Sequence, residues 1–539
     1  MMDEAARTPA LTLIDHYVER AMPELGAPGF ALAVTGRDGP LPTRTYGYAD
    51  LGALTPVDDE TLFESGSIGK TFTAVCVLQL AEEGIIDLHA PVTAYLPWFA
   101  VRSQHAPITI HHLLSHTAGI IEGTEFPLDA RFEVWALRDT DAAPPGGRGW
   151  YSNVGYKALG LVLEAVTGKP YAEIVQERIF DPLGMMRSVA TITHDVRRRL
   201  AVGYVPFYDD RPWRPAHGLA PATWLETNTG DGSLASTAED LATFLRMLLN
   251  GGAGPNGRLL TAATFALMRA PHAEFNMGVP HGYGLFAFER DARHLIGHEG
   301  DMVGNVAAML GDVDAGMGVA VMMNGMCSPG DIADFALRTI IAAGAGEALP
   351  EPPEIPALEP ADYVGEFRGE SADLVIEAEA GRLILIADEE RFLLEPLSSQ
   401  ESSDEFVVDD PKFSRFLLSF GRDATGSVVE LTHGGDWYAA DAYEGTRTFE
   451  TLPEWAAFAG HYRSYNPWLS NFRIVTRKGQ LWMIYPRGYE LPLTPDGEGF
   501  RIGDDPESPE RISFDTIVTG EALRARLAGS ADYYRFFTP

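Results

Sequence analysis

A proline-rich stretch near residue 350 divides the chain into two parts with different folding patterns. It spans residues 348–356 and contains four prolines, which is typical of an extended linker. Before it, helical and strand patterns alternate, whereas after it short apolar runs are separated by Gly and Asp turns, as in an all-β fold. We therefore expect a mixed helix and strand domain over 1–347, followed by two barrel-like β domains over 348–450 and 451–539.

An internal repeat supports the division of the second part. Tyr363–Phe367 with Gly381-Arg382-Leu383 is similar to Phe458–Tyr462 with Gly479-Gln480-Leu481, at a separation of 95 to 98 residues. A period of this length is enough for one small β-barrel or curled sheet. The repeat therefore predicts two such domains in succession.

The first part is expected to be α/β (α+β), with helices packed on a mainly antiparallel sheet. Apolar residues at helical spacing predict helices over 67–83, 156–166 and 238–249. Gly84 ends the first of these helices. Short apolar runs predict strands over 29–34, 305–310 and 319–323.

The chain is strongly acidic, with 41 basic and 76 acidic side chains and a formal net charge of −35. Nucleic acids and anionic membranes are polyanions, so neither is expected as a partner. Cys76 and Cys327 are the only cysteines, too few for a disulfide framework or a four-ligand zinc site. No apolar run reaches about 18 residues, and the acidic N-terminus does not read as a secretory signal. We therefore expect a cytoplasmic location.

The sharpest chemical signal is Ser67, followed three residues later by Lys70 at the start of a predicted helix. This spacing puts both side chains on one helix face. A serine hydroxyl is a weak nucleophile until a base removes its proton, and a lysine held beside it, where its charge is disfavoured, can be that base. The helix N-terminus would also stabilise an oxyanion formed there. Ser65, the neighbouring alternative, has Ile68 rather than a lysine at this spacing.

Two further motifs follow in the chain. Tyr151-Ser152-Asn153 precedes a predicted helix, and His298-Glu299-Gly300 precedes a predicted strand pair. With Ser67 and Lys70, they make residues 10–345 resemble the penicillin-recognising serine hydrolases: class C β-lactamases, D,D-carboxypeptidases, D-aminopeptidases and their esterase relatives. The stretches 109–119, 181–185 and 232–241 are similar to the same family. The resemblance implies a β-lactamase-like fold for the first domain, and the overall plan is similar to that of three-domain D-aminopeptidases.

The resemblance also implies catalytic roles. Ser67 would be the acylated nucleophile, and Lys70 and Tyr151 would share the general-base and general-acid work. Asn153 would hydrogen-bond Lys70 and the substrate. The backbone N–H groups of Ser67 and Asp301 would form the oxyanion hole.

His298 and Gly300 would lie on the substrate-binding strand. His298 stands where many relatives have a lysine that attracts an anionic substrate terminus, and an imidazole is largely neutral near pH 7. Glu299 adds negative charge, although strand alternation would point it away from the pocket. Gly300 would let the substrate approach the strand backbone closely. These features favour a free-amine terminus or a neutral ester over an anionic terminus.

The preferred function is therefore peptidase or amidase activity on short peptides or other small molecules through an acyl-enzyme, D-aminopeptidase-like. The alternatives are a carboxylesterase, and then a β-lactamase or a non-turnover penicillin-binding sensor. Ligand binding by the β domains and a homodimer also stay open.

No cofactor or metal is expected. His111, His112 and His116 resemble a metal cluster but lack the adjacent carboxylates of a metal site. The family resemblance implies structural roles for them. The sequence has no G-x-x-x-x-G-K-[ST] motif and no G-x-G-x-x-G that follows a predicted strand, which gives no support for a nucleotide cofactor.

Overall fold

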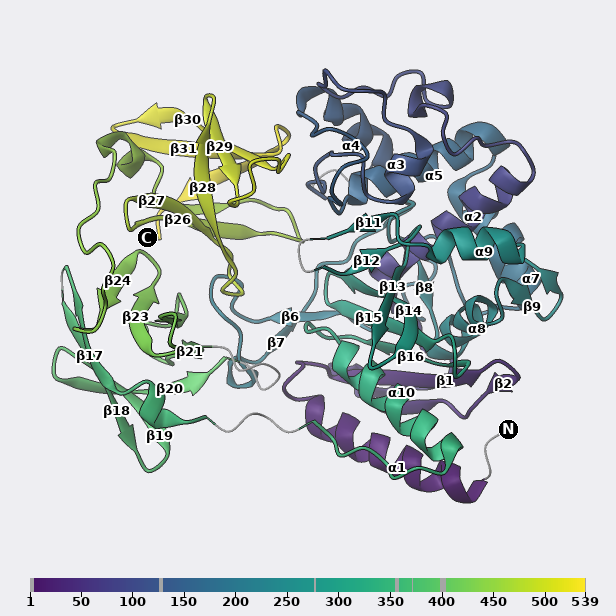
Figure 1. The fold of residues 1–539 in the computed structure, drawn as a ribbon, viewed down its shortest axis with the longest axis horizontal. Coiled ribbons are helices and arrows are strands. Elements are labelled where there is room, and N and C mark those ends of the chain that lie inside the picture. Colours follow the sequence, from purple (N-terminus) through teal and green to yellow (C-terminus); the bar gives the residue numbers. More distant parts are fainter. Residues whose placement is uncertain are drawn as a thin grey trace. The chain divides into compact units, whose positions relative to one another are not determined.

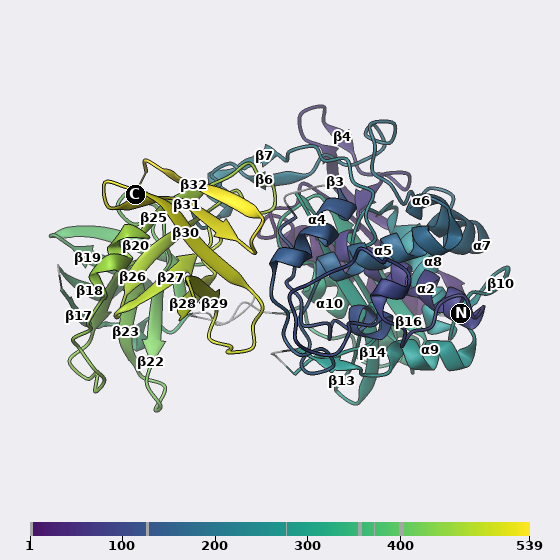
Figure 2. The same ribbon diagram turned by 90° about the horizontal axis from the view of Figure 1, so that it is seen from above.

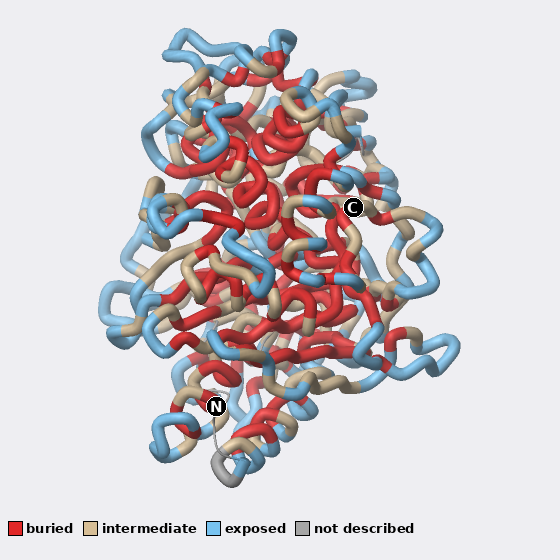
Figure 3. Tube along the Cα trace, turned by 90° about the vertical axis from the view of Figure 1, so that its right-hand side faces the viewer, coloured by how far each residue is buried: buried red, intermediate tan, exposed pale blue. Residues whose placement is uncertain are grey.

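The computed structural model describes residues 4–125, 129–275, 278–353, 358–370, 372–397 and 404–538. The chain divides into two compact units. The N-terminal unit contains Met1–Val205 and Leu219–Pro353, and the barrel unit contains Pro206–Gly218 and Glu354–Pro539. Figures 1 and 2 show their elements from two directions, and Figure 3 shows which stretches of chain are buried.

A large antiparallel sheet forms the centre of the N-terminal unit (Figure 1). Within the described residues it has ten strands, of which β2 pairs only with β1. In spatial order the strands are β11 (Ala273–Glu274), β12 (Pro280–His281), β13 (Phe286–Arg290), β14 (Arg293–Met302), β15 (Asn305–Asp312), β16 (Met317–Met323), β1 (Gly29–Gly36), β3 (Arg44–Asp50) and β4 (Thr55–Pro56), with β2 (Gly39–Pro40) beside β1. The described residues also contain three two-stranded pairings: β5 (Phe63–Glu64) with β8 (Ala235–Ser236), β6 (Tyr204–Pro206) with β7 (Leu219–Pro221), and β9 (Ala253–Gly254) with β10 (Gly257–Arg258).

Helices lie on both faces of this sheet. The helices of the described residues are α1 (Glu4–Ala21), α2 (Gly69–Glu82), α3 (Ile110–Leu114), α4 (Ala130–Ala136), α5 (Asn153–Thr167), α6 (Tyr171–Val175), α7 (Asp181–Leu183), α8 (Ala238–Leu249), α9 (Ala262–Arg269) and α10 (Gly330–Ala345), of which several pack only on other helices. Helices α1 and α10 run side by side over one face (Figure 1), where Phe30 and Leu32 of β1 join their core. The alternate residue Ala31 points to the other face, where α8 packs on β1 and β16. Because both faces are covered, the central strands read as unbroken apolar runs.

The predicted arrangement of helices on a mainly antiparallel sheet is confirmed. Helix α8 has the predicted bounds 238–249, and the predicted strands lie within β1, β15 and β16. The helix predicted over 67–83 differs at its start, because a 3-10 turn at Gly66–Ile68 precedes α2. Gly84 follows α2 with a φ of 74°, a left-handed conformation that glycine adopts at little cost.

The barrel unit contains two closed antiparallel barrels, each of eight strands in the part of the chain that the structure describes. The first has β17 (Gly365–Gly369), β18 (Asp373–Glu379), β19 (Arg382–Ala387), β20 (Glu390–Pro396), β21 (Glu405–Val407), β22 (Leu418–Arg422), β23 (Val428–His433) and β24 (Asp436–Ala439). The second has β25 (Gly460–Arg463), β26 (Asn471–Arg477), β27 (Gln480–Ile484), β28 (Glu490–Asp496), β29 (Gly499–Ile502), β30 (Arg511–Val518), β31 (Glu521–Leu527) and β32 (Ala531–Phe536). The sequence repeat falls on equivalent positions, because its two halves lie at the first and third strands of each barrel.

The insert Pro206–Gly218 belongs to the barrel unit although it lies within the sequence of the first. Asn471 Nδ2 donates to the Asp209 carbonyl at 2.8 Å, and Arg473 Nη1 donates to the Asp210 carbonyl at 2.9 Å. Nothing in the sequence indicated this grouping. Among the helices of the described residues, none is both long and apolar enough to cross a membrane.

Candidate active site

Ser67 and Lys70 meet at the start of α2. The half-buried Ser67 lies in the 3-10 turn that follows β5, and Lys70 lies in the first helical turn, where its side chain is completely buried. Lys70 Nζ donates a hydrogen bond to Ser67 Oγ at 2.9 Å. The structure therefore brings the predicted nucleophile and base into direct contact.

The second anchor of Lys70 is a backbone carbonyl that the sequence analysis missed. Nζ also donates to the carbonyl oxygen of Asp231 at 3.0 Å. The predicted hydrogen bond between Asn153 and Lys70 is absent, and within the described residues Asn153 Oδ1 is buried without a hydrogen-bond partner. The only sequence signal near this carbonyl is the glycine at 232, which packs closely on the start of α2. A Cβ on Gly69 would lie 3.1 Å from the Cα of Gly232.

Tyr151 lies directly before α5, beside the same lysine. Lys70 Nζ is 4.9 Å from the centroid of the Tyr151 ring. Among the described residues, the Tyr151 hydroxyl has no hydrogen bond to Ser67 or Lys70. His116 stacks on the ring with centroids 4.5 Å apart, and its Nδ1 accepts the Ser152 N–H at 2.9 Å. His116 therefore fixes the Tyr151 segment, a specific form of the structural role that the family resemblance implied.

The two N–H groups predicted for the oxyanion hole lie on neighbouring backbone segments. A Cβ on Gly66 would be 2.5 Å from the Asp301 nitrogen, and a Cβ on Gly300 would be 3.0 Å from the Ser67 nitrogen. The same Cβ on Gly300 would be only 1.8 Å from the Ser65 carbonyl oxygen. Gly300 is thus required by close backbone packing, whereas the sequence analysis had attributed it to substrate approach.

His298 is buried and its ring lies 6.3 Å from that of Tyr151, measured between centroids. Its Nδ1 is 2.6 Å from the carbonyl oxygen of Glu299, and because a carbonyl only accepts, Nδ1 carries the proton. Burial, together with the charge of Lys70, lowers the pKa of His298 to about 3. Glu299 itself points away, and its Oε2 accepts the Ser328 hydroxyl at 2.6 Å. Residue 298 is therefore uncharged at neutral pH.

Comparison with known proteins agrees with this geometry. The sequence profile of the beta-lactamase family matches residues 14–343. The chain belongs to the beta-lactamase family.

Its relatives include penicillin-binding proteins and an esterase. Penicillin-binding protein 4 of Amycolatopsis lactamdurans is 32% identical over 359 residues, which cover 62% of this chain and 91% of that protein. Esterase EstB of Burkholderia gladioli is 33% identical over 223 residues, which cover 37% of this chain and 55% of EstB. The octameric penicillin-binding protein homologue from Pyrococcus abyssi has 24% identity and a TM-score of 0.60, covering 79% of this chain and 99% of that one, and shows the shared fold. The chain is thus a member of a serine hydrolase family with the β-lactamase fold.

The histidines that resembled a metal cluster have other partners in this family member. His111 Nδ1 is 2.7 Å from the Tyr283 hydroxyl, and His112 Nδ1 accepts the Thr109 N–H at 3.1 Å in a capping box. In the described part of the chain, no group of three or more His, Cys, Asp or Glu residues is placed to hold a metal ion.

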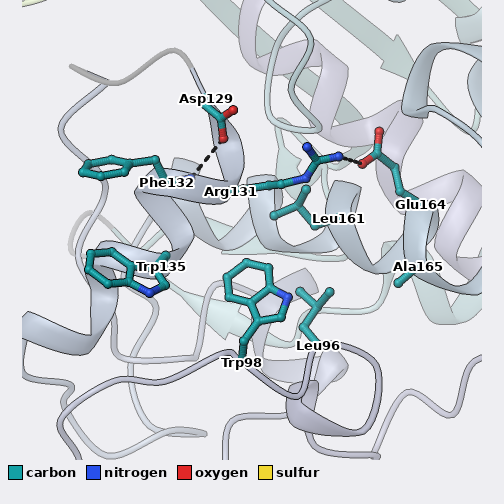
Figure 4. Close-up of a pocket in the computed structure, with 9 residues that line it drawn as sticks. All are labelled: Leu96, Trp98, Asp129, Arg131, Phe132, Trp135, Leu161, Glu164 and Ala165. Carbon is teal, nitrogen blue, oxygen red and sulfur yellow. Dashed lines mark hydrogen bonds and ion pairs between the residues drawn. The ribbon is translucent and has the colours of Figure 1, made fainter.

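A separate hollow of about 1010 Å³ lies in the N-terminal unit, between α4, α5 and the turn at 96–98 (Figure 4). Its walls carry the exposed rings of Trp98, Phe132 and Trp135, and Arg131 forms an ion pair with Glu164 at 3.6 Å. None of the predicted site residues lines it. The hollow is therefore distinct from the predicted site.

Proposed function

We propose that this protein is a serine hydrolase that forms an acyl-enzyme on Ser67. The observation that carries the proposal is the 2.9 Å hydrogen bond between Ser67 Oγ and the fully buried Lys70 Nζ. A lysine held in this way beside a hydroxyl, and kept from water, can exchange a proton with it during attack on a carbonyl.

The reaction has two halves. In acylation, Lys70 in its neutral amine form takes the Ser67 proton while Oγ attacks the substrate carbonyl. The N–H groups of Ser67 and Asp301 receive the oxyanion. Tyr151 passes a proton to the departing amine or alcohol, and the proton that Lys70 took from Ser67 replaces it. In deacylation, water attacks the ester on Ser67, the same groups take the water proton and deliver it to Oγ, and the serine hydroxyl is restored as the acid product departs.

The preferred substrates are small amides or short peptides with a free amine terminus, as for a D-aminopeptidase. The uncharged His298 supports this choice, because it offers no cation to an anionic substrate terminus. The second candidate, a carboxylesterase, is favoured by the similarity to EstB. β-Lactamase activity ranks third for the same electrostatic reason.

A four-substrate assay tests the proposal and ranks the candidates. D-alanine p-nitroanilide, L-alanine p-nitroanilide, p-nitrophenyl butyrate and nitrocefin are compared on the wild type, on Ser67→Ala and on Ser65→Ala. Ser65 is a matched control, because its buried hydroxyl donates to the Leu234 carbonyl at 3.0 Å and contacts no reacting group. We expect Ser67→Ala to lose activity on every substrate. Undiminished turnover in Ser67→Ala would refute the proposal, and the preferred substrate separates peptidase from esterase.

A further inference from the structure

Lys157 is a buried cation on the helix that follows Tyr151. It lies one helical turn after Asn153 on α5, and its side chain is only 3% exposed. A lysine is rarely buried to this extent unless it is paired with opposite charges. The sequence analysis gave it no role.

Three carboxylates from three other segments surround this lysine. Its Nζ donates to Glu125 Oε2 at 2.5 Å and to Glu133 Oε2 at 2.6 Å, and lies 3.8 Å from Asp231 Oδ2. Burial lowers the pKa of Lys157, but these carboxylates raise it overall. Burial and the charge of Asp231 raise the pKa of Glu125 to about 8. Lys157 is therefore charged at neutral pH, and protonation of Glu125 offsets part of the excess negative charge.

One residue of this cluster also contacts the proposed base. Asp231, whose side chain faces Lys157, uses its backbone carbonyl to accept the second hydrogen bond of Lys70 Nζ at 3.0 Å. The first hydrogen bond of that amine goes to Ser67 Oγ. The position of the Asp231 carbonyl therefore decides the direction in which the amine points.

A second set of contacts connects the cluster to the segment that carries Tyr151. Glu133 Oε1 accepts the backbone N–H groups of Thr124 and Glu125 at 2.7 and 3.0 Å, which fixes the chain at 121–125. In turn, the Ile121 carbonyl accepts the Ser152 hydroxyl at 2.7 Å. The cluster thus connects the anchors of two groups that act on Ser67.

We propose that Lys157 is a positioning residue for acylation, which holds Asp231 and the 121–125 segment so that Lys70 and Tyr151 face Ser67. The inference rests on the proposed function. Without the lysine, carboxylates would remain in the interior with no buried cation between them, which is strongly destabilising, and we expect the segments that carry them to move apart. A shift of about 1 Å at a reacting group can cost about 100-fold in rate.

The test is the rate at which a fluorophosphonate probe labels Ser67. The probe reacts with an activated serine when Oγ attacks phosphorus and fluoride leaves, and it needs no knowledge of the natural substrate. The variants are Lys157→Met, Asp231→Asn and the double variant Lys157→Met/Glu133→Gln. The double variant removes the ion pair between Lys157 and Glu133 while keeping the net charge of the cluster. Lys169→Met is the matched control, because Lys169 also pairs with two glutamates but at the surface.

We expect the maximal labelling rate to fall at least about tenfold in Lys157→Met and in the double variant, as for a reacting group displaced by a fraction of an ångström. The fall in Asp231→Asn should be smaller, because its carbonyl remains. The half-saturating probe concentration, the labelling stoichiometry and the Lys169→Met rate should stay within about twofold. A purely stabilising lysine would lower the labelled fraction and leave the rate of the folded molecules unchanged.

Two results would overturn the inference and leave the proposed function intact: a wild-type labelling rate in folded Lys157→Met, or a wild-type labelling rate in the double variant. If Lys157→Met does not fold, the double variant decides, and if neither folds, a wild-type rate in Asp231→Asn overturns the inference. A wild type that is not labelled at Ser67 contradicts the proposed function itself, and the inference fails with it.

Discussion

Gly300→Ala is the sharpest test of the proposed oxyanion hole. The added Cβ would lie 1.8 Å from the Ser65 carbonyl oxygen and 3.0 Å from the Ser67 nitrogen. Non-bonded heavy atoms settle at about 3.5 Å, so β14 and the turn at Gly66–Ile68 must separate by more than about 1.5 Å. That movement pulls the Asp301 N–H away from the Ser67 N–H. Since about 1 Å of misplacement costs about 100-fold, we expect kcat/KM to fall at least 100-fold, which corresponds to about 2.7 kcal/mol of transition-state stabilisation.

The assay compares kcat/KM of Gly300→Ala with that of the wild type on the substrate that is preferred in the four-substrate panel. Gly39→Ala is the control, because it makes the same change in the same sheet at a position where an added Cβ meets no atom within 4 Å. Circular dichroism and thermal melting show whether each variant is folded. A folded Gly300→Ala enzyme with kcat/KM within threefold of the wild type would refute the argument.

Three further predictions follow from the site and the fold. His298→Lys places a cation near Ser67. A nearby charge pair contributes about 1 to 4 kcal/mol, so the rate on nitrocefin relative to the rate on D-alanine p-nitroanilide should rise at least about tenfold. An unchanged ratio would contradict the proposed effect of charge at residue 298 on substrate choice. Burial lowers the pKa of His298 to about 3 and those of His111 and His461 to about 4, so below pH 6.5 these three side chains are protonated in the unfolded chain before the native one. They outnumber Glu64 and Glu125, whose pKa values are raised to about 7 and about 8 and which act in the opposite direction. The free energy of unfolding in urea should therefore fall between pH 6.5 and pH 4, and a level profile would count against these burial effects. Thr237→Ala removes the hydroxyl that accepts an N–H at 3.2 Å at the start of α8. It should lower the free energy of unfolding, measured at equilibrium, by about 1 kcal/mol. Thr243→Ala, inside the same helix, is the control and should lower it by less.

Features encoded by local spacing could be predicted from the sequence. The helix at 238–249 follows from a Thr cap and an apolar stripe, and the structure has the same bounds. The Ser67 and Lys70 pair follows from a three-residue separation in one helical turn, which survives although that turn begins as a 3-10 helix. The repeat likewise predicted two β domains, because each copy carries the same turn before the same strand.

Features that depend on long-range backbone contacts could not be predicted. The Asp231 carbonyl meets Lys70 across 161 residues, and a carbonyl is present at every residue, so the residue type carries no signal for this contact. The insert Pro206–Gly218 is held by the barrel unit through carbonyl oxygens of Asp209 and Asp210, and its sequence, a loop-like run with three prolines, carries no signal for the unit that it joins. Asn153 shows the opposite case. Its amide was predicted to hydrogen-bond Lys70, but the carbonyl of Asp231 takes that position.

The role of Gly300 decides where substrate preference should be sought. If the glycine were needed to admit the substrate, its replacement would discriminate between large and small substrates. The structure instead places the Ser65 carbonyl where a side chain would go, so replacement should impair all substrates alike by disturbing the oxyanion hole. Residue 298 differs, because its ring is buried beside Tyr151 and its Nδ1 donates to the Glu299 carbonyl rather than to a group of the predicted oxyanion hole. We therefore expect charge at position 298 to change which substrate terminus is favoured while the N–H groups of Ser67 and Asp301 stay in place.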